Sequence, residues 1–205
     1  MPTRVEKVAE SLPVQTVATV IAALAGGPLA AMLPVLATSL ASGRQKIRVE
    51  TSLSEISQIL ESHEVALRDL TDAQYKLINE AILASLQTTQ AEKLSLLRNA
   101  VRQSLDMSDI EPQEAILLSR IIRDISAEEV KFVVKNFSYD GVVLAESDMG
   151  EKTILSVPAN SRDALLVGGL LSLGVLTPGQ PTLGQILRFS GIVAKLIVIL
   201  RDTDD

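Results

Sequence analysis

Hydrophobic residues recur three or four positions apart through the middle of the chain. Between Arg44 and about Leu70 the recurring positions are Leu53, Ile56, Leu60, His63, Leu67 and Leu70. This spacing places side chains on one face of a helix, and it returns in further stretches up to residue 138. We therefore predict a mainly α protein with a helical bundle over residues 44–138.

Helix-start signals divide this region. The patterns Thr71 to Gln74, Thr89 to Glu92 and Ser126 to Glu129 have the form of capping boxes, in which a hydroxyl residue precedes Glu or Gln by three positions. Pro112, directly after Glu111, suits the first turn of another helix. Each signal precedes a stretch with helical periodicity, so these four positions predict four helix starts.

After residue 138 the pattern becomes mixed. β-branched residues and turn residues over 141–157 predict a small hairpin or an irregular arm. Ser161 can cap a helix that runs to Leu173 and is broken or softened by Gly168 and Gly169. Residues 177–179 read as a turn, 183–190 as a strand, and 192–200 as a strand or a buried helix. We expect residues 139–205 to form a small mixed α/β module with the outline of a winged helix.

The N-terminal region has a different character, because no charged residue occurs from Pro13 to Gly43. Glycine and proline at positions 26–28 break this run, which favours either two short helices joined at a corner or one kinked span. We predict an apolar helical pair over residues 1–43. The residues that we expect to form its membrane-contacting or hinge positions are Val20, Leu24, Gly26, Gly27, Pro28, Leu33 and Leu36.

Two interpretations of this uncharged run stay open. Its length exceeds the roughly 20 residues needed to cross a bilayer, and the cations Arg44, Lys46 and Arg48 after it would hold that end on the cytoplasmic side. Each half alone, at about 12 to 14 residues, is too short to cross. The other interpretation is a helical hairpin buried in a soluble fold. A signal peptide fits less well, because the run is broken and longer than an ordinary signal core.

Composition argues against several function classes. The chain has no cysteine, one histidine, few aromatic residues and a net charge of −6. No thiolate site or disulfide can form, and the acidic balance with scarce aromatic side chains argues against nucleic-acid binding. We predict no cofactor, no metal site and no small-molecule substrate. The expected location is the cytoplasm or the cytoplasmic face of the inner membrane.

The remaining candidates for chemistry have structural interpretations. His63 has no second ligand at helical spacing, and no G-x-S-x-G pattern supplies a nucleophile. The pairs Glu111/Glu114 and Glu128/Glu129 suit helix starts better than acid–base catalysis. A further candidate is a partner patch at Arg120 and Arg123, together with Arg44, Lys46 and Arg48; its alternative is an ordinary ion pair with Asp124.

Three stretches together resemble a loose group of uncharacterised bacterial helical proteins. They are residues 26–42, residues 92–101 and residues 119–126. The resemblance implies an apolar N-terminal segment, a helical bundle and a degenerate winged-helix C-terminal part, and it implies no activity. The function we predict is that of a non-enzymatic, membrane-associated or membrane-active protein. The alternative is a soluble module that binds a protein partner or itself, with DNA binding less favoured.

Overall fold

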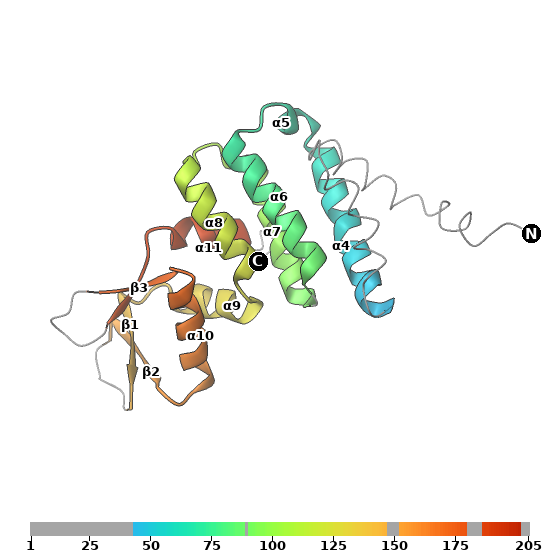
Figure 1. Cartoon of the computed structure of the whole chain (residues 1–205). Helices are drawn as coiled ribbons and strands as arrows, with labels where there is room; N and C mark the ends of the chain where they lie inside the picture. The colour runs from blue at the N-terminus through green and yellow to red at the C-terminus, as the bar shows by residue number, and fades with distance from the viewer. Residues whose placement is uncertain (1–42, 89, 147–151, 180–185, 202–205) are drawn as a thin grey trace, which may run out of the picture. The chain divides into compact units, whose positions relative to one another are not determined.

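The protein is described by a computed structural model over residues 43–88, 90–146, 152–179 and 186–201 (Figure 1). It divides into two compact units, one ending at Ile110 and one beginning at Glu111. The predicted apolar pair over residues 1–43, with all its membrane or hinge candidates, lies outside the described residues except for Gly43.

The first unit is helical. It contains α4 (Gly43–Ser62), α5 (Glu64–Arg68), α6 (Asp72–Gln87) and α7 (Ala91–Asp106). Helices α4, α6 and α7 contact one another and lie side by side (Figure 1). The largest of their fully buried side chains are those of Ile56, Leu60, Leu77, Ile78, Leu97 and Val101. Ile56 and Leu60 belong to the apolar positions predicted for the first helix.

Local side chains decide where these helices begin and end. The Thr71 capping box is confirmed, with the Gln74 N–H donating to Thr71 Oγ1 over 3.2 Å. Helix α7 begins after Gln90, which makes no side-chain cap. Thr89, the first residue of the box predicted here, lies outside the described residues. The helix predicted to reach Leu70 stops at Ser62, where Ser62 Oγ and His63 Nδ1 each lie 2.8 Å from the Ile59 carbonyl oxygen. Side chains that bond to nearby backbone in this way favour helix ends.

The second unit combines helices with a small sheet. Its elements are α8 (Pro112–Asp124), α9 (Ala127–Asn136), β1 (Gly141–Ala145), β2 (Ile154–Pro158), α10 (Arg162–Ser172), β3 (Leu176–Pro178), β4 (Leu187–Phe189) and α11 (Val193–Leu200). Pro112 begins α8 and the Ser126–Glu129 box begins α9, as predicted. Helix α10 passes through both glycines without a break, and residues 193–200 form a helix rather than a strand.

The sheet has the strand order β2-β1-β4-β3. Strands β1 and β2 run parallel, so the predicted hairpin over 141–157 was wrong. The two strands of a hairpin are antiparallel neighbours, whereas β1 and β2 point the same way. The turn predicted at 177–179 was also wrong in part, because Thr177 and Pro178 belong to β3, which pairs antiparallel with β4.

The division between the units differs from the boundary predicted after residue 138. Helices α8 and α9 belong with the strands, because their side chains meet elements that follow them in the chain. The Lys195 ammonium of α11 lies 2.6 Å from Glu114 of α8, and the rings of Phe137 and Phe189 make an edge-to-face contact at 5.6 Å. Periodicity alone could not assign α8 and α9, since a helix that packs on a sheet shows the same apolar stripe as one in a bundle.

Candidate functional site: interaction surfaces

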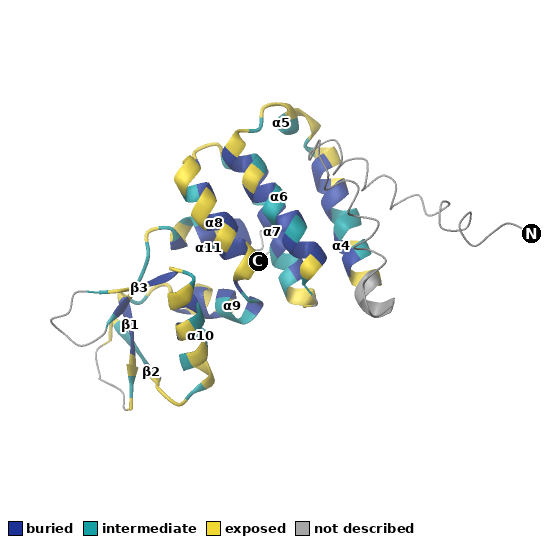
Figure 2. Cartoon of the chain, in the orientation of Figure 1, coloured by how far each residue is buried: buried dark blue, intermediate teal, exposed yellow. Residues whose placement is uncertain are grey.

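Helix α10 presents an apolar face to solvent. Leu165 is 77% exposed and Leu171 is 40% exposed, and Gly168 and Ser172 are exposed between and beside them. Exposed positions occur along the whole helix (Figure 2). Beyond Arg162 and Asp163 in the first turn the helix has no charged residue. An ordinary surface helix is polar on its outer side, so this face is unusual.

The opposite side of α10 is held in place by the rest of the second unit. Val167 and Leu170 are buried, and the helix contacts α9, β2 and β3. At Gly169 the approach is so close that a methyl group would overlap Glu129 Oε1 and lie 3.2 Å from Glu129 Cδ. At Gly168 the same construction meets no atom within 4 Å. The helix is therefore fixed on one side and open on the other.

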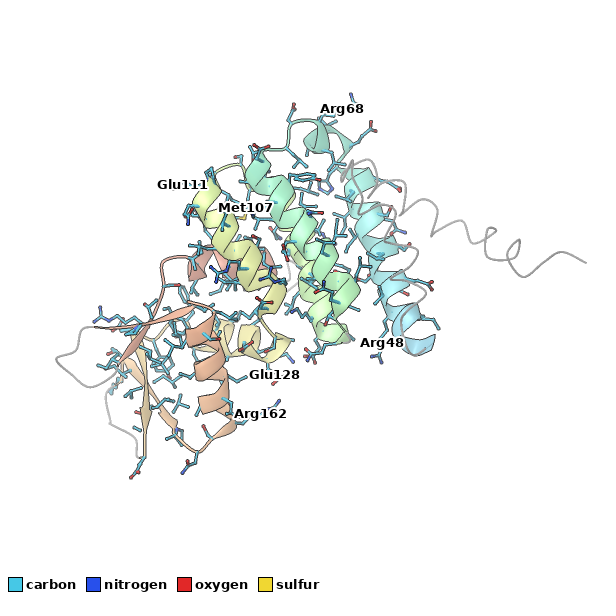
Figure 3. The ribbon with its side chains drawn as sticks, in the orientation of Figure 1. Arg48, Arg68, Met107, Glu111, Glu128 and Arg162 are labelled. Atoms are coloured by element: carbon cyan, nitrogen blue, oxygen red, sulfur yellow. The ribbon has the colours of Figure 1, made fainter. Side chains whose placement is uncertain are left out.

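Ion pairs at the start of α10 link it to α9. Glu128 on α9 accepts from Arg162 over 3.3 Å and from Lys131 over 3.5 Å, and Figure 3 shows Glu128 and Arg162 beside each other. Ser161 Oγ accepts from the Ala164 N–H over 3.2 Å and caps the helix. All three charged side chains are substantially exposed, so water and salt screen the ion pairs. The pairs therefore orient α10 relative to α9 and contribute little to the free energy of folding.

The basic residues predicted as a partner patch lie in both units. Arg44, Lys46 and Arg48 belong to the first turns of α4, where Arg48 is exposed. Arg120 and Arg123 are exposed on α8, and Arg123 donates twice to Asp124 over 3.1 Å. Asp124 therefore pairs with its neighbour Arg123 and not in the predicted four-residue spacing from Arg120.

The groups considered for catalysis have local structural roles. His63 Nδ1 lies 2.8 Å from the Ile59 carbonyl oxygen and 3.0 Å from Ser62 Oγ, at the junction of α4 and α5. Glu129 accepts from Ser126 in a capping box, and Glu114 accepts from the Glu111 N–H over 3.1 Å. Within the described ranges, no three side chains of the metal-binding types are grouped so that they could hold an ion.

Two polar contacts, one buried and one partly buried, were not predicted from the sequence. The Gln74 amide donates to the carbonyl oxygens of Ser104 and Leu105, each over 3.1 Å, while its oxygen accepts from the Thr71 N–H. It thus satisfies two of the carbonyls left free at the end of α7. The other is the Glu114–Lys195 pair, whose side chains are 29% and 30% exposed. The ammonium of Lys195, with a smaller part from the Glu111 N–H, lowers the pKa of the Glu114 carboxyl. The sequence offered one signal for these contacts, the predicted capping box that contains Gln74, and it offered none for the Glu114–Lys195 pair.

Among the residues placed by the structure, no helix is at once long enough and apolar enough to cross a membrane. Comparison of the chain with protein-family models, with curated proteins and with solved structures finds no match.

Proposed function

We propose that the protein is a non-enzymatic, membrane-associated protein whose uncharged segment contacts the bilayer. The observation that carries this proposal is the absence of charge from Pro13 to Gly43, followed at once by Arg44, Lys46 and Arg48. A segment of this composition favours the hydrocarbon region of a bilayer, and the cations favour an anionic headgroup layer. In support, Arg48 is exposed near the start of α4.

The roles of the polar residues in the folded part are consistent with a protein that binds rather than catalyses. The candidate acids and the histidine serve helix ends, as described above. We also propose a bacterial origin, because residues 26–42, 92–101 and 119–126 resemble bacterial helical proteins. A location at the cytoplasmic face of a membrane fits the cations Arg44, Lys46 and Arg48 that follow the uncharged run.

Vesicle flotation tests this proposal. The full chain should float with vesicles of phosphatidylethanolamine and phosphatidylglycerol, and Leu24→Arg should reduce flotation, since a charge at bilayer depth costs about 2.5 to 3.5 kcal/mol on insertion scales. Circular dichroism of the same variant should match the wild type. If Leu24→Arg instead collapses solubility and melting temperature together, the segment is a buried hairpin and the membrane proposal is lost.

A second candidate function is a protein-interaction module, favoured by the apolar outer face of α10. Helix α10 followed by the antiparallel strands β3 and β4 also supports the winged-helix-like interpretation. A helix that reads DNA needs cations on its outer side for the phosphates, and the single cation of α10, Arg162, pairs with Glu128. A protein partner fits this face better than DNA does. If the wild type and Leu165→Glu bind DNA with equal affinity at physiological salt, the result supports neither a protein partner nor DNA at this face. If the wild type binds DNA tightly and Arg162→Gln does not, DNA is favoured over a protein partner.

A further inference from the structure

We propose that the exposed side of α8 pairs antiparallel with the same side of α8 in a second copy of this chain, so that the protein forms a reversible dimer. This inference goes beyond the proposed membrane association and does not depend on it. We call the positions Gln113, Ile116, Leu117 and Arg120 the α8 face.

The α8 face has an apolar centre. Ile116 and Leu117 are each 40% exposed. Gln113, one turn before them, and Arg120, one turn after them, are exposed too, and exposed positions recur along α8 (Figure 2). Positions three and four apart are neighbours on one side of a helix, so these side chains form one continuous face. Covering its two adjacent apolar side chains would remove them from water, which favours association.

The charges around this centre have opposite signs at the two ends of α8. Glu111 is exposed at the start of the helix, where Figure 3 labels it, and Arg120 is exposed in its second half. Arg123 already donates to Asp124, so Arg120 supplies the cation of the face. A parallel pair of α8 helices would bring like charges together, whereas an antiparallel pair brings the basic end of each helix to the acidic end of the other. This charge complementarity favours a second copy as the occupant and sets its direction.

The spacing of the face also sets the register. We place the two-fold axis between Ile116 and Leu117, so that each residue lies opposite the one equally far from the axis on the other side. Arg120 then lies opposite Gln113 of the second copy, and about 3 Å of helix rise from the level of its Glu111. Ile116 and Leu117 pack on the same two residues of the second copy. Because α8 has 13 residues and is only about 20 Å long, the interface is small, and we expect a dissociation constant on the order of 100 µM.

Charge changes at one exposed position test the pairing in the full chain. In sedimentation velocity at about 10 to 500 µM protein, the wild-type mass should rise from 22.0 kDa towards twice that value. Gln113→Glu should tighten the dimer about fivefold, since it places a carboxylate opposite Arg120 in both halves of the interface. Gln113→Lys should weaken the dimer by about the same factor. Combining Gln113→Lys with Arg120→Glu exchanges the two charges and should restore the association.

A pair of leucine variants separates the α8 face from other exposed apolar positions. Leu117→Ser should weaken the dimer about tenfold or more, because each copy loses part of the apolar centre. The matched control is Leu165→Ser, which removes an exposed leucine from α10 and should leave the dimer unchanged. Both substitutions are at exposed positions, so the fold should be kept, which circular dichroism checks.

Three results would overturn the proposal. A chain that stays monomeric over the whole concentration range forms no α8 dimer. Association that responds equally to Gln113→Glu and Gln113→Lys, or that Leu165→Ser abolishes, belongs to another surface or another register. Failure of Gln113→Lys with Arg120→Glu to restore the dimer would remove the contact between these two positions. Since these measurements contain no lipid, a failure of vesicle flotation leaves their outcome unchanged, and the two proposals are tested separately.

Discussion

The two adjacent glycines of α10 should respond in opposite ways to the same substitution. Replacing glycine by alanine inside a helix stabilises it by about 0.5 to 1 kcal/mol, because alanine loses less backbone entropy. Gly168→Ala should show this full gain, since its methyl group meets open space. Gly169→Ala should not, since its methyl group would displace the Glu129 carboxylate.

The cost at Gly169 follows from what Glu129 already does. Its Oε2 accepts from both the N–H and the hydroxyl of Ser126 over 2.7 Å, at the start of α9. A helix N-cap of this kind contributes about 0.5 to 2 kcal/mol. Displacing the carboxylate would therefore offset or exceed the gain from alanine, and the two variants should differ by about 0.5 to 2 kcal/mol.

Urea unfolding followed by circular dichroism at the helix band measures these differences, and a double-mutant cycle isolates their cause. Glu129→Ala removes the carboxylate, so Gly169→Ala in that background should stabilise as much as Gly168→Ala does in the wild type. The coupling free energy between positions 129 and 169 should equal the cost of displacing the carboxylate, about 0.5 to 2 kcal/mol. If Gly169→Ala stabilises the wild type as much as Gly168→Ala, with no coupling to Glu129, the inferred contact is wrong.

Three further predictions concern the buried and paired polar groups. Gln74→Met keeps the volume of the side chain but leaves the α7 carbonyls and the Thr71 N–H without their partner. The free energy of unfolding, measured in urea, should therefore fall by about 2 to 4 kcal/mol, and a fall of less than about 0.5 kcal/mol would contradict this. The folded-state pKa of Glu114 lies below its ordinary value of 4.5, so its stabilisation is complete above that value and is lost as the pH falls through the lowered pKa. Lys195→Met should therefore lower the melting temperature at pH 7 and much less at acidic pH below that range, and an equal loss at both would argue against the pair. His63→Ala should cost less than about 1 kcal/mol of stability and leave vesicle flotation unchanged; a hundredfold loss of binding by a folded variant would give this residue a functional role.

Helix positions were the most predictable part of the fold. The Ser126 and Thr71 boxes mark helix starts because the signal is local: a side chain bonds to backbone three residues away. Pro112 is a local signal too, because its fixed φ and missing N–H suit the first turn of α8. The β-branched residues of 141–157 likewise predicted extended structure. Their parallel pairing was not predictable, because strand direction depends on the partner that the rest of the chain provides.

The candidate surfaces were less predictable for the same reason. Helix α10 was predicted, but which of its sides is buried depends on α9 and the sheet, and Leu165 has the same hydrophobicity as the buried Leu170. The contact of Gln74 with residues 30 positions away is likewise a product of packing. Lys195 and Glu114, 81 residues apart, could be joined only by the complete second unit.

The strand order of the second unit also has a consequence for the time course of protein synthesis. Strand β1 lies between β2 and β4, and Val142 pairs with Leu187. On the ribosome, β1 therefore has only its parallel neighbour until residue 187 has emerged, while the contacts among α4, α6 and α7 need nothing beyond Ile110. Since chains are made at about 5 to 20 residues per second, the first unit can be complete for several seconds before the sheet closes. During that interval, the backbone groups on the edge of β1 that later pairs with β4 are open to pairing with another strand.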